Sequence, residues 1–475
     1  MNILIISTNR NQFPMPVIPV GACMIAETAQ NAGYKVRLLD LMFERNPLNT
    51  VQEELKRFNP DVVGFSIRNI DNNDMQSPSF YIKEILPLID TVKRKIPANI
   101  ILGGAAVSVM PEALLRYTRA SFAVTGDGET VFIKLLERLS EGRSPKDLPG
   151  VSWIEEDVFK SNAQPLSTNS YHCWSPDFYS WINVKAYRER LTTVPLQTKL
   201  GCHFKCIYCT YRKIEGNQYR LSKPEEAVNT IISLASRGSR HIEFVDNVFN
   251  SPYHHALSIC ESLAKVKHGA SLQSLELNPL FIDDTLITTM ERAGFSGMGI
   301  TVESASDSVL SGLGKGFTAE HVYKAAEVIK RHKIPCVWIF MMGGPNETRE
   351  TVAETLQFAE NYIRPHDVAF FGLGIRIYPG TELESLARQQ GVLSLTPENM
   401  LEPVFYISPT IEYSRMQKQV KVSMNKHMNF INTDSIGFPI LLPIHRFGYK
   451  LGLRPPLWKH TRSIRRSLRF LGMDV

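Results

Sequence analysis

The sequence predicts an α/β protein in three parts: an N-terminal flavodoxin/Rossmann-like, doubly wound parallel sheet, a partial (β/α)6 TIM-type barrel, and a mostly helical C-terminal region. Two observations predict this class. Short β-branched segments alternate with amphipathic segments of helical length in two series along the chain, which is typical of parallel sheets covered by helices. The length of 475 residues is also about three times that of a typical domain, so we expect several domains.

The first series, over residues 1–145, predicts a doubly wound domain with five strands. The expected strands are residues 3–7, 35–40, 61–66, 99–103 and 122–125. Ligands of such sheets bind beyond the carboxyl ends of the strands. The loops that follow these strands are rich in Gly, Asn and Asp, and they are therefore the candidate binding loops.

The second series, over residues 193–385, predicts a barrel that is not closed. Its six expected strands are residues 194–199, 241–246, 272–277, 297–303, 336–342 and 368–378. A closed TIM barrel has eight strand–helix units, so a barrel of six has an open side that another domain or a substrate must cover. The segment between the two series, residues 146–192, shows no clear period and is expected to be a connection.

The C-terminal region, residues 386–475, is expected to be helical and is strongly basic. From Tyr413 onward it holds 12 Lys and Arg residues against 2 Asp and Glu residues, whereas the whole chain has a net charge of +6. A basic segment with interleaved aromatic residues can attract anionic lipid head groups, phosphates or, less favoured here, nucleic acid. A solvated tail that docks on an acidic face of the body explains the pattern equally well, so peripheral membrane contact and simple docking both stay open.

The composition predicts a cytoplasmic globular protein. Apolar residues make up 43% of the chain and charged residues 21%, which excludes collagenous, disordered and disulfide-scaffold classes. Seven cysteines, an odd number in a long chain, argue for a reducing compartment. The first residues lack the pattern of a secretory signal, and no apolar run reaches the ~18 residues that a membrane span needs.

The sharpest motif is a Cys-x3-Cys-x2-Cys run formed by Cys202, Cys206 and Cys209, just after the first expected strand of the barrel. Three thiolates on one tight loop can each bind one iron of a four-iron cluster and leave the fourth iron open. A structural zinc site needs a fourth ligand, and His203 lies inside the loop, where it can hardly complete a tetrahedron. The motif therefore predicts an iron–sulfur cluster with an open position.

This loop resembles that of the radical S-adenosylmethionine (SAM) superfamily, and the resemblance extends over residues 194–382. It implies that Cys202, Cys206 and Cys209 hold a [4Fe–4S] cluster whose open iron chelates SAM, and that an electron from the cluster cleaves SAM to a 5'-deoxyadenosyl radical. Tyr208 occupies the family's aromatic position, where the backbone lies near the adenine.

Further motifs follow in the order of that family. Asp246 and Asn247 end the second strand, where the family contacts the methionine amino group; the usual Gly-Gly-Glu is absent, so only the backbone position carries over. Glu303 and Ser304 resemble the ribose and carboxylate contacts, and Lys315-Gly316 completes the pattern. The remaining matches are Gly344, which follows the fifth strand, and Arg376, in an Arg-Ile-Tyr-Pro-Gly-Thr segment that is either turned toward the active site or exposed.

The first domain resembles the cobalamin-binding class of the same superfamily. The matching residues are Ser66 after the third strand, Gly103 and Gly104 after the fourth, and Gly126 and Gly128 after the fifth. Glycines there let the backbone approach a bulky planar ligand. The family's Asp-x-His-x-x-Gly is absent and no histidine precedes His172, so Arg68 is the side chain expected near the lower face of the cobalt. A scaffold without cofactor is the alternative for this domain.

The resemblance implies a cobalamin-dependent radical SAM methyltransferase with a [4Fe–4S] cluster, SAM and cobalamin as cofactors. It would methylate an unactivated carbon of a small-molecule or lipid-like substrate through methylcobalamin and a 5'-deoxyadenosyl radical, and receive electrons from a donor such as flavodoxin or ferredoxin. Two alternatives stay open: a cobalamin-binding cyclase or ring-rearranging enzyme that transfers no methyl group, and a redox-sensing binding protein.

Overall fold

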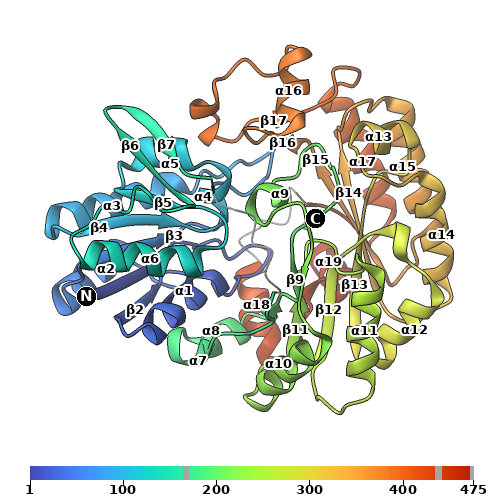
Figure 1. Cartoon of the computed structure of the whole chain (residues 1–475). Coiled ribbons are helices and arrows are strands. Elements are labelled where there is room, and N and C mark those ends of the chain that lie inside the picture. The colour runs from blue at the N-terminus through green and yellow to red at the C-terminus, as the bar shows by residue number, and fades with distance from the viewer. Residues whose placement is uncertain (164–170, 434–440, 471–475) are drawn as a thin grey trace.

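The computed structural model of the chain describes residues 1–163, 171–433 and 441–470, and it consists of two α/β halves packed side by side (Figure 1). One hydrophobic cluster crosses between them: it contains Val63 and Leu102 of the first sheet together with Leu313 and Ile377 of the second half. The halves are therefore joined by a continuous core. Residues 164–170 of the predicted connection, and residues 434–440 and 471–475 of the C-terminal region, lie outside the described residues.

The first half has the predicted doubly wound architecture. Five parallel strands lie in the order β2-β1-β3-β4-β5, so the chain reverses direction across the sheet between β1 and β3, where such folds bind ligands. The strands are β1 (Asn2–Ser7), β2 (Lys35–Asp40), β3 (Val62–Ser66), β4 (Asn99–Gly103) and β5 (Phe122–Val124). The helices are α1 (Val20–Asn31), α2 (Pro47–Phe58), α3 (Ile82–Lys95), α4 (Ala105–Val109), α5 (Pro111–Thr118) and α6 (Gly128–Ser140).

The first sheet continues past residue 145, where the sequence places the end of this domain. β6 (Val151–Glu155) pairs antiparallel with β5, and β7 (Val158–Ser161) pairs antiparallel with β6. The expected connection is thus partly an extension of the sheet. Short strands joined by a tight turn give too little periodic sequence to distinguish them from a loop. The rest of the connection contains α7 (Phe178–Trp181) and α8 (Val184–Arg188).

The second half is an open barrel of parallel strands in the order β18-β15-β14-β13-β12-β11-β8, with helices on its outside (Figure 1). The six predicted strands are β8 (Val194–Leu196), β11 (His241–Phe244), β12 (Ser271–Leu277), β13 (Phe295–Glu303), β14 (Cys336–Met342) and β15 (Val368–Leu373). A seventh, β18 (Phe430–Asn432), comes from the C-terminal region. The helices are α10 (Pro224–Ser236), α11 (Tyr253–Ala264), α12 (Asp284–Arg292), α13 (Asp307–Gly312), α14 (Ala319–Lys330) and α15 (Arg349–Tyr362).

Two of the expected barrel strands are shorter than predicted. The first stops at Leu196, and the chain then forms β9 (Lys199–Leu200), which pairs antiparallel with β10 (Arg220–Leu221). The last is broken at Gly374, whose φ of 82° turns the chain out of the barrel. The residues beyond it form β16 (Ile375–Arg376), which pairs with β17 (Phe405–Tyr406).

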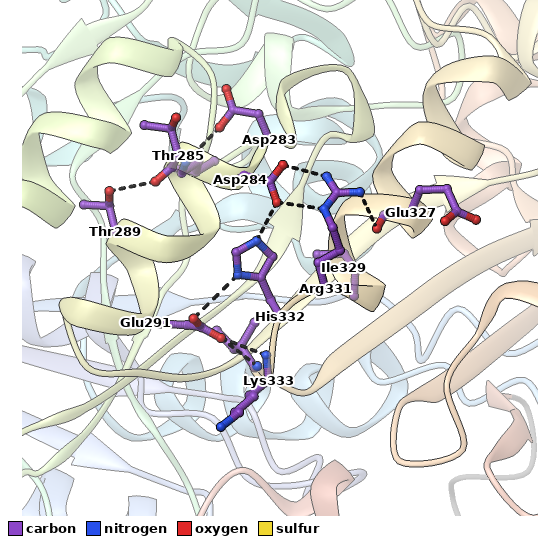
Figure 2. A network of polar contacts seen from close by, with 12 residues as sticks. Asp283, Asp284, Thr285, Thr289, Glu291, Glu327, Ile329, Arg331, His332 and Lys333 are labelled. Carbon is purple, nitrogen blue, oxygen red and sulfur yellow. Dashed lines mark hydrogen bonds and ion pairs between the residues drawn. The ribbon is translucent and has the colours of Figure 1, made fainter.

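Helices on the outside of the barrel are linked by ionic contacts that Figure 2 shows. Arg331, after α14, donates to Asp284 at the start of α12, with 2.6 Å between Nη2 and Oδ2. His332 Nε2 lies 2.9 Å from the same carboxylate, and its Nδ1 lies 3.6 Å from Glu291. Arg331 and Asp284 are exposed, so each such pair contributes at most about 1 kcal/mol, and the network aligns neighbouring helices.

Part of the basic C-terminal segment is built into the barrel. Trp458, which is 5% exposed, packs with Val337 and Val368 near the amino ends of β14 and β15. A Cβ on Gly297 in β13 would lie 2.7 Å from Cζ2 of Trp458. The segment around Trp458 thus closes the floor of the barrel. The basic charge of the segment did not predict this structural role.

The remaining elements pack around the barrel and against the first half. They are α9 (Tyr211–Ile214), η1 (Pro279–Phe281), α16 (Glu382–Gln389), η2 (Pro397–Leu401), α17 (Tyr413–Lys426), α18 (Leu441–Lys450), η4 (Leu457–His460) and α19 (Thr461–Phe470). Arg465 in α19 is 6% exposed and donates to the carbonyl of His427 at 3.2 Å. Contact of this region with lipids stays a prediction. Among the described residues, no helix combines the length and the apolar character that crossing a bilayer requires.

Replacing Trp458 with alanine is expected to lower the free energy of unfolding by about 3–5 kcal/mol, because the indole fills the barrel floor and leaves a cavity when it is removed. Urea denaturation followed by far-UV circular dichroism measures this change. Phe470→Ala, at an aromatic residue that is 91% exposed on α19, should change the free energy by less than about 0.5 kcal/mol. Equal changes in the free energy of unfolding for the two substitutions would show that Trp458 does not stabilise the barrel floor.

Candidate active site

The loop with three cysteines follows β9 at the carboxyl edge of the barrel. Gly201, with φ 87°, starts it; a Cβ there would lie 2.0 Å from the carbonyl oxygen of Gln218, so only glycine fits. Cys202 is buried, whereas Cys206 and Cys209 are half-buried, and all three are free thiols. The backbone N–H of Cys209 donates to the carbonyl of Cys206 at 3.2 Å, which closes a tight turn.

The donor set of this loop fits an iron–sulfur cluster. Burial raises the pKa of Cys202 and of Cys206, and raises that of Cys209 to about 12, so the thiols need a bound cation to lose their protons at neutral pH. His203 Nδ1 lies 2.8 Å from the hydroxyl of Tyr219, which gives the ring a partner other than a metal. Three soft sulfur ligands on one loop suit a cluster that keeps one iron open.

A buried ion pair lies beside the cysteine loop. Lys315 Nζ lies 2.8 Å from Glu303 Oε1 and 3.2 Å from the hydroxyl of Tyr208, which itself donates to Glu303 Oε1 at 2.7 Å. Burial and the Glu303 charge raise the pKa of Tyr208, so its hydroxyl keeps the proton that it donates. Tyr208 therefore contributes a side-chain contact in addition to its predicted position in the loop.

Glu303 is held in an unusual conformation with one oxygen free. Its φ is 58°, and it follows a register shift at the end of β13, so the backbone is strained in the way that often marks a functional site. Oε2 is buried and has no hydrogen-bond partner among the described residues. An unsatisfied buried carboxylate oxygen can accept a hydrogen bond from a ligand.

Removing Lys315 is expected to destabilise the protein, because Glu303 would then be a buried charge without a counterion. Lys315→Met should lower the free energy of unfolding by about 3–5 kcal/mol, measured by urea denaturation. The double variant Glu303→Gln/Lys315→Met should recover much of that loss, because it removes both charges. A double variant as unstable as the single one would contradict this account.

Two of the predicted SAM contacts have partners inside the fold. Asp246 is fully buried and accepts from the backbone N–H of Thr198 at 2.7 Å and from its hydroxyl at 2.7 Å, so its side chain holds the turn between β8 and β9. The hydroxyl of Ser304, also fully buried, lies 3.0 Å from that of Thr355 in α15. Both side chains already have hydrogen-bond partners in the barrel. They stabilise the fold and are not placed for a direct contact with SAM.

Arg376 corrects the prediction most clearly. It is 6% exposed, and its Nε donates to Asp71 of the first half at 2.9 Å, while its Nη2 donates to the carbonyl of Met400 at 2.8 Å. It is thus neither turned toward the barrel interior nor exposed. The break at Gly374 moves Arg376 into β16, which pairs antiparallel with β17, and there Arg376 ties the two halves together.

Asn247 and Gly344 remain at the carboxyl edge of the barrel. Asn247 Nδ2 donates to Glu215 Oε2 at 2.5 Å, and its buried Oδ1 has no partner among the described residues. Glu215, which the sequence analysis missed, also accepts from the backbone N–H of Gly201 at 3.0 Å and so fixes the start of the cysteine loop. A Cβ on Gly344 would lie 3.1 Å from Leu313, so glycine keeps the backbone close to α13.

Two further acidic side chains inside the barrel also escaped the sequence analysis: Glu243 on β11 and Glu276 on β12. Burial raises the pKa of both, and for Glu276 burial together with the charges of Glu303 and Glu243 raises it to about 8. A charged residue inside a predicted barrel strand was the available signal, because every second side chain of a barrel strand faces the interior.

The predicted glycine-rich loops of the first half share one cavity of about 560 Å³. It is lined by Ser66, Gly103, Gly104, Gly126 and Gly128. Its apolar wall includes Phe65 and Phe132, and a Cβ on Gly103 would meet no atom within 4 Å. This volume lies within the usual range of ligand sites, and the glycines leave a cradle for a planar group.

The opposite wall of this cavity belongs to the barrel half. Gln197, Leu200, Glu215 and Arg220, which flank the cysteine loop in sequence, all line it. Arg220 forms an ion pair with Asp127 across the two halves. The cysteine loop lies in the chain between β9 and β10, and Leu200 of β9 and Arg220 of β10 both line the glycine-rich cavity.

Arg68 does not line the glycine-rich cavity. It is exposed and lines a neighbouring cavity of about 670 Å³ together with Thr8, Asn9 and Arg10. Its positive charge lowers the pKa of Glu243 in the barrel, although burial raises that pKa overall. Arg68 therefore faces the space between the two halves. The carboxyl groups of Glu243 and Glu276 face the same space from the barrel.

The sequence matches two family models. The model of the radical SAM superfamily matches residues 197–359, and the model of the B12 binding domain matches residues 6–136. The chain is also 26% identical over 384 residues to an uncharacterized methyltransferase from Pyrococcus horikoshii, which covers 79% of each chain. It is 23% identical over 445 residues to tryptophan 2-C-methyltransferase from Streptomyces laurentii, covering 80% of this chain and 74% of the relative.

A solved structure has the same fold over nearly the whole chain. It is the radical S-adenosylmethionine methyltransferase TsrM from Kitasatospora setae with cobalamin and a [4Fe–4S] cluster bound, with a TM-score of 0.85 at 22% sequence identity. The match covers 99% of each chain. The two halves, the open barrel and the C-terminal region therefore form one architecture shared with that protein.

Proposed function

Because the chain belongs to the cobalamin-binding enzymes of the radical SAM superfamily, we propose that it is a methyltransferase that methylates an unactivated carbon atom of a small molecule. The similar proteins named as methyltransferases support this reaction type, and tryptophan is the substrate named for one of them. The chemistry follows from the domain pair: when bound, the cluster supplies an electron, SAM supplies the methyl group and a radical, and cobalamin supplies the cobalt that carries the methyl group.

The residues that would hold each group follow from the site. Cys202, Cys206 and Cys209 would bind the cluster. The free oxygens of Glu303 and Asn247 would accept hydrogen bonds from SAM, with the backbone at Asp246 and Gly344 beside them. Cobalamin would occupy the cavity lined by the following residues, and Arg68, which lines the neighbouring cavity, would lie beside it in place of a histidine: Ser66, Gly103, Gly104, Gly126 and Gly128.

The observation that carries the proposal is the shared wall between the two cofactor sites. The glycine-rich cavity is bounded on one side by strand ends of the first sheet and on the other by residues that flank the cysteine loop. A methyl group that passes between SAM, cobalt and substrate needs these sites close together and closed to water. The first half covers the open side of the barrel and so excludes water from the space between them.

The proposal is tested on protein purified anaerobically and reconstituted with iron, sulfide and hydroxocobalamin. With titanium citrate as reductant and SAM labelled with ¹⁴C in its methyl group, label should appear in the cobalamin fraction together with S-adenosylhomocysteine. Reduction by flavodoxin or ferredoxin tests the expected electron donors in the same assay. Absence of label from cobalamin, with iron and cobalamin both bound, would refute methyl transfer.

Product mass separates the proposed reaction from the cyclase or ring-rearranging alternative. Candidate substrates incubated with the reconstituted enzyme and deuterated SAM should gain one methyl group that carries the deuterium. A product of unchanged carbon count, formed together with 5'-deoxyadenosine, would favour the alternative. Tight binding of a polyanion without any cleavage of SAM would instead indicate a redox-sensing binding protein.

A further inference from the structure

The interior of the barrel contains more hydrogen-bond acceptors than the proposed cofactors explain. Glu243 Oε2 accepts from the hydroxyl of Thr193 at 2.6 Å and from Gln273 Nε2 at 2.6 Å, and none of the described residues donates to its Oε1. Gln273 and Glu243 are direct partners in the register of β11 and β12. Their side chains therefore form one polar cluster on neighbouring strands.

Gln273 gives an independent indication that this cluster binds a ligand. Its side chain is 2% exposed, and its Oε1 has no hydrogen-bond partner among the described residues. Its Nε2 is already committed to Glu243, so Oε1 lies against the same cluster and needs a donor. A buried amide oxygen without a partner costs about 1–3 kcal/mol, and a bound donor would recover it.

Glu276 adds a second carboxyl group to this cluster. A register shift between Ser274 and Leu277 interrupts the pairing of β12 with β13, and such bulges redirect a side chain. The Glu276 side chain is exposed to the barrel interior, yet protein surrounds it closely enough that burial is the main cause of its raised pKa. No ion pair or hydrogen bond holds its carboxyl group among the described residues.

Within the part of the chain that the structure describes, no basic side chain forms an ion pair with Glu243 or Glu276. Lys315, the nearest lysine that affects Glu276, already donates to Glu303 and to Tyr208. Arg68 acts on Glu243 only through its charge, from the first half of the molecule, and it forms no ion pair with Glu243 or Glu276. The cluster therefore offers only acceptors, two of them acidic, to whatever enters the barrel from the side of Arg68.

Two members of the cluster, Glu243 and Gln273, lie below the proposed SAM contacts. Glu243 is the residue before the last of β11, and Gln273 is the third residue of β12, whereas Glu303 ends β13 and the cysteine loop lies beyond the strands. A ligand held by Glu243 and Gln273 would therefore sit deeper in the barrel than the cofactor edge, with Glu276 nearer that edge, and Arg68 lies on the side of the first half.

On the basis of the proposed function, we propose that Glu243, Gln273 and Glu276 bind a positively charged amino group of the methyl acceptor, so that the substrate is an amine and not a neutral lipid. An ammonium group has three donors and one positive charge, which match the free acceptors of the cluster. Charged hydrogen bonds of this kind are also strong enough to orient a small substrate.

The test uses the reconstituted protein with S-adenosylhomocysteine present to prevent turnover. Two pairs of probes differ only in the group concerned: 2-phenylethylamine with 2-phenylethanol, and n-butylamine with n-butanol. Isothermal titration calorimetry should show at least about tenfold tighter binding of an amine than of its matched alcohol, or about 1.4 kcal/mol. Equal affinities within both pairs, or no binding of any of the four probes, would overturn the proposal.

Variants then assign the effect to the cluster. Two substitutions are used, Glu276→Gln and Glu243→Gln, and the first of them removes no side-chain contact of the fold. Each should weaken amine binding by at least about tenfold and alcohol binding by less than about twofold. Glu261→Gln, an exposed position on the outer helix α11, is the matched control and should bind the amine as the wild type does. Melting temperatures verify that each variant is folded.

The affinity for SAM separates the two sites. An equal loss of SAM binding in Glu276→Gln and Glu243→Gln would assign these carboxyl groups to SAM and overturn the inference. The transfer of label from SAM to cobalamin in the wild type is measured separately. If no label is transferred but the protein still prefers amines, the methyltransferase proposal is refuted and the cation site remains. If label is transferred but the protein shows no preference for amines, the amine site alone is refuted.

Discussion

Replacing Cys202, Cys206 or Cys209 with alanine is expected to abolish cleavage of SAM, with a loss of at least about a hundredfold, because two thiolates cannot retain a cluster that needs three. Bound iron should fall from about four atoms per chain to less than one, measured together with the charge-transfer absorption of the cluster after anaerobic reconstitution. The three thiols share one loop, so each substitution should have the same result.

Cys260→Ala is the matched control for this experiment. Cys260 is a buried free thiol on α11, outside the cysteine loop, so its loss should leave iron content unchanged and reduce stability by only about 1 kcal/mol. Iron content that stays near four in all three loop variants would show that the ligands lie elsewhere. Iron lost equally in Cys260→Ala would point to general unfolding as the cause.

Filling the glycine cradle with a side chain is expected to abolish binding of cobalamin. Gly103→Leu would project four carbon atoms into the cavity of about 560 Å³ from a position where a Cβ meets no atom within 4 Å. We therefore expect cobalamin to fall from about one per chain to less than a tenth, without unfolding of the protein. Absorption spectra after incubation with hydroxocobalamin and gel filtration measure the bound fraction.

Two variants make this result specific. Gly103→Ala adds a single methyl group to open space, so it should retain most of the cobalamin. Gly103→Leu should also retain its iron, because the cysteine loop lies beyond the opposite wall of the cavity. Full cobalamin binding by Gly103→Leu would place the cofactor elsewhere, and would reduce the first half to a scaffold that shapes the cleft.

The parts of the molecule that the sequence predicted well depend on local patterns. The alternation of strand and helix along the chain is a property of neighbouring residues, and the order of the two sheets follows from rules for parallel strands. The cysteine motif is equally local, since its three cysteines lie within eight residues. The five glycine and serine positions at the strand ends line one cavity for the same reason: the carboxyl ends of parallel strands meet at one edge.

The incorrect predictions concern side chains whose partners are distant in sequence. Arg376 lies in a segment that reads as a barrel strand, yet its partner Asp71 is more than 300 residues away, and only the packing of the two halves brings them together. The basic tail gave no sign that Trp458 closes the barrel floor, because the fit of an indole against Gly297 is a property of the assembled barrel.

The sequence alone determined the class of fold, the loop that gathers Cys202, Cys206 and Cys209, and the loops of the first domain, since each depends on short-range periodicity or spacing. Only the tertiary structure decided which polar side chains have hydrogen-bond partners within the fold and which keep atoms free for a ligand. Asp246 and Ser304 are satisfied by buried partners, whereas Oε2 of Glu303 and Oε1 of Gln273 are buried and have no hydrogen-bond partner among the described residues. Whether a buried polar group has a partner depends on long-range packing, which no local pattern specifies.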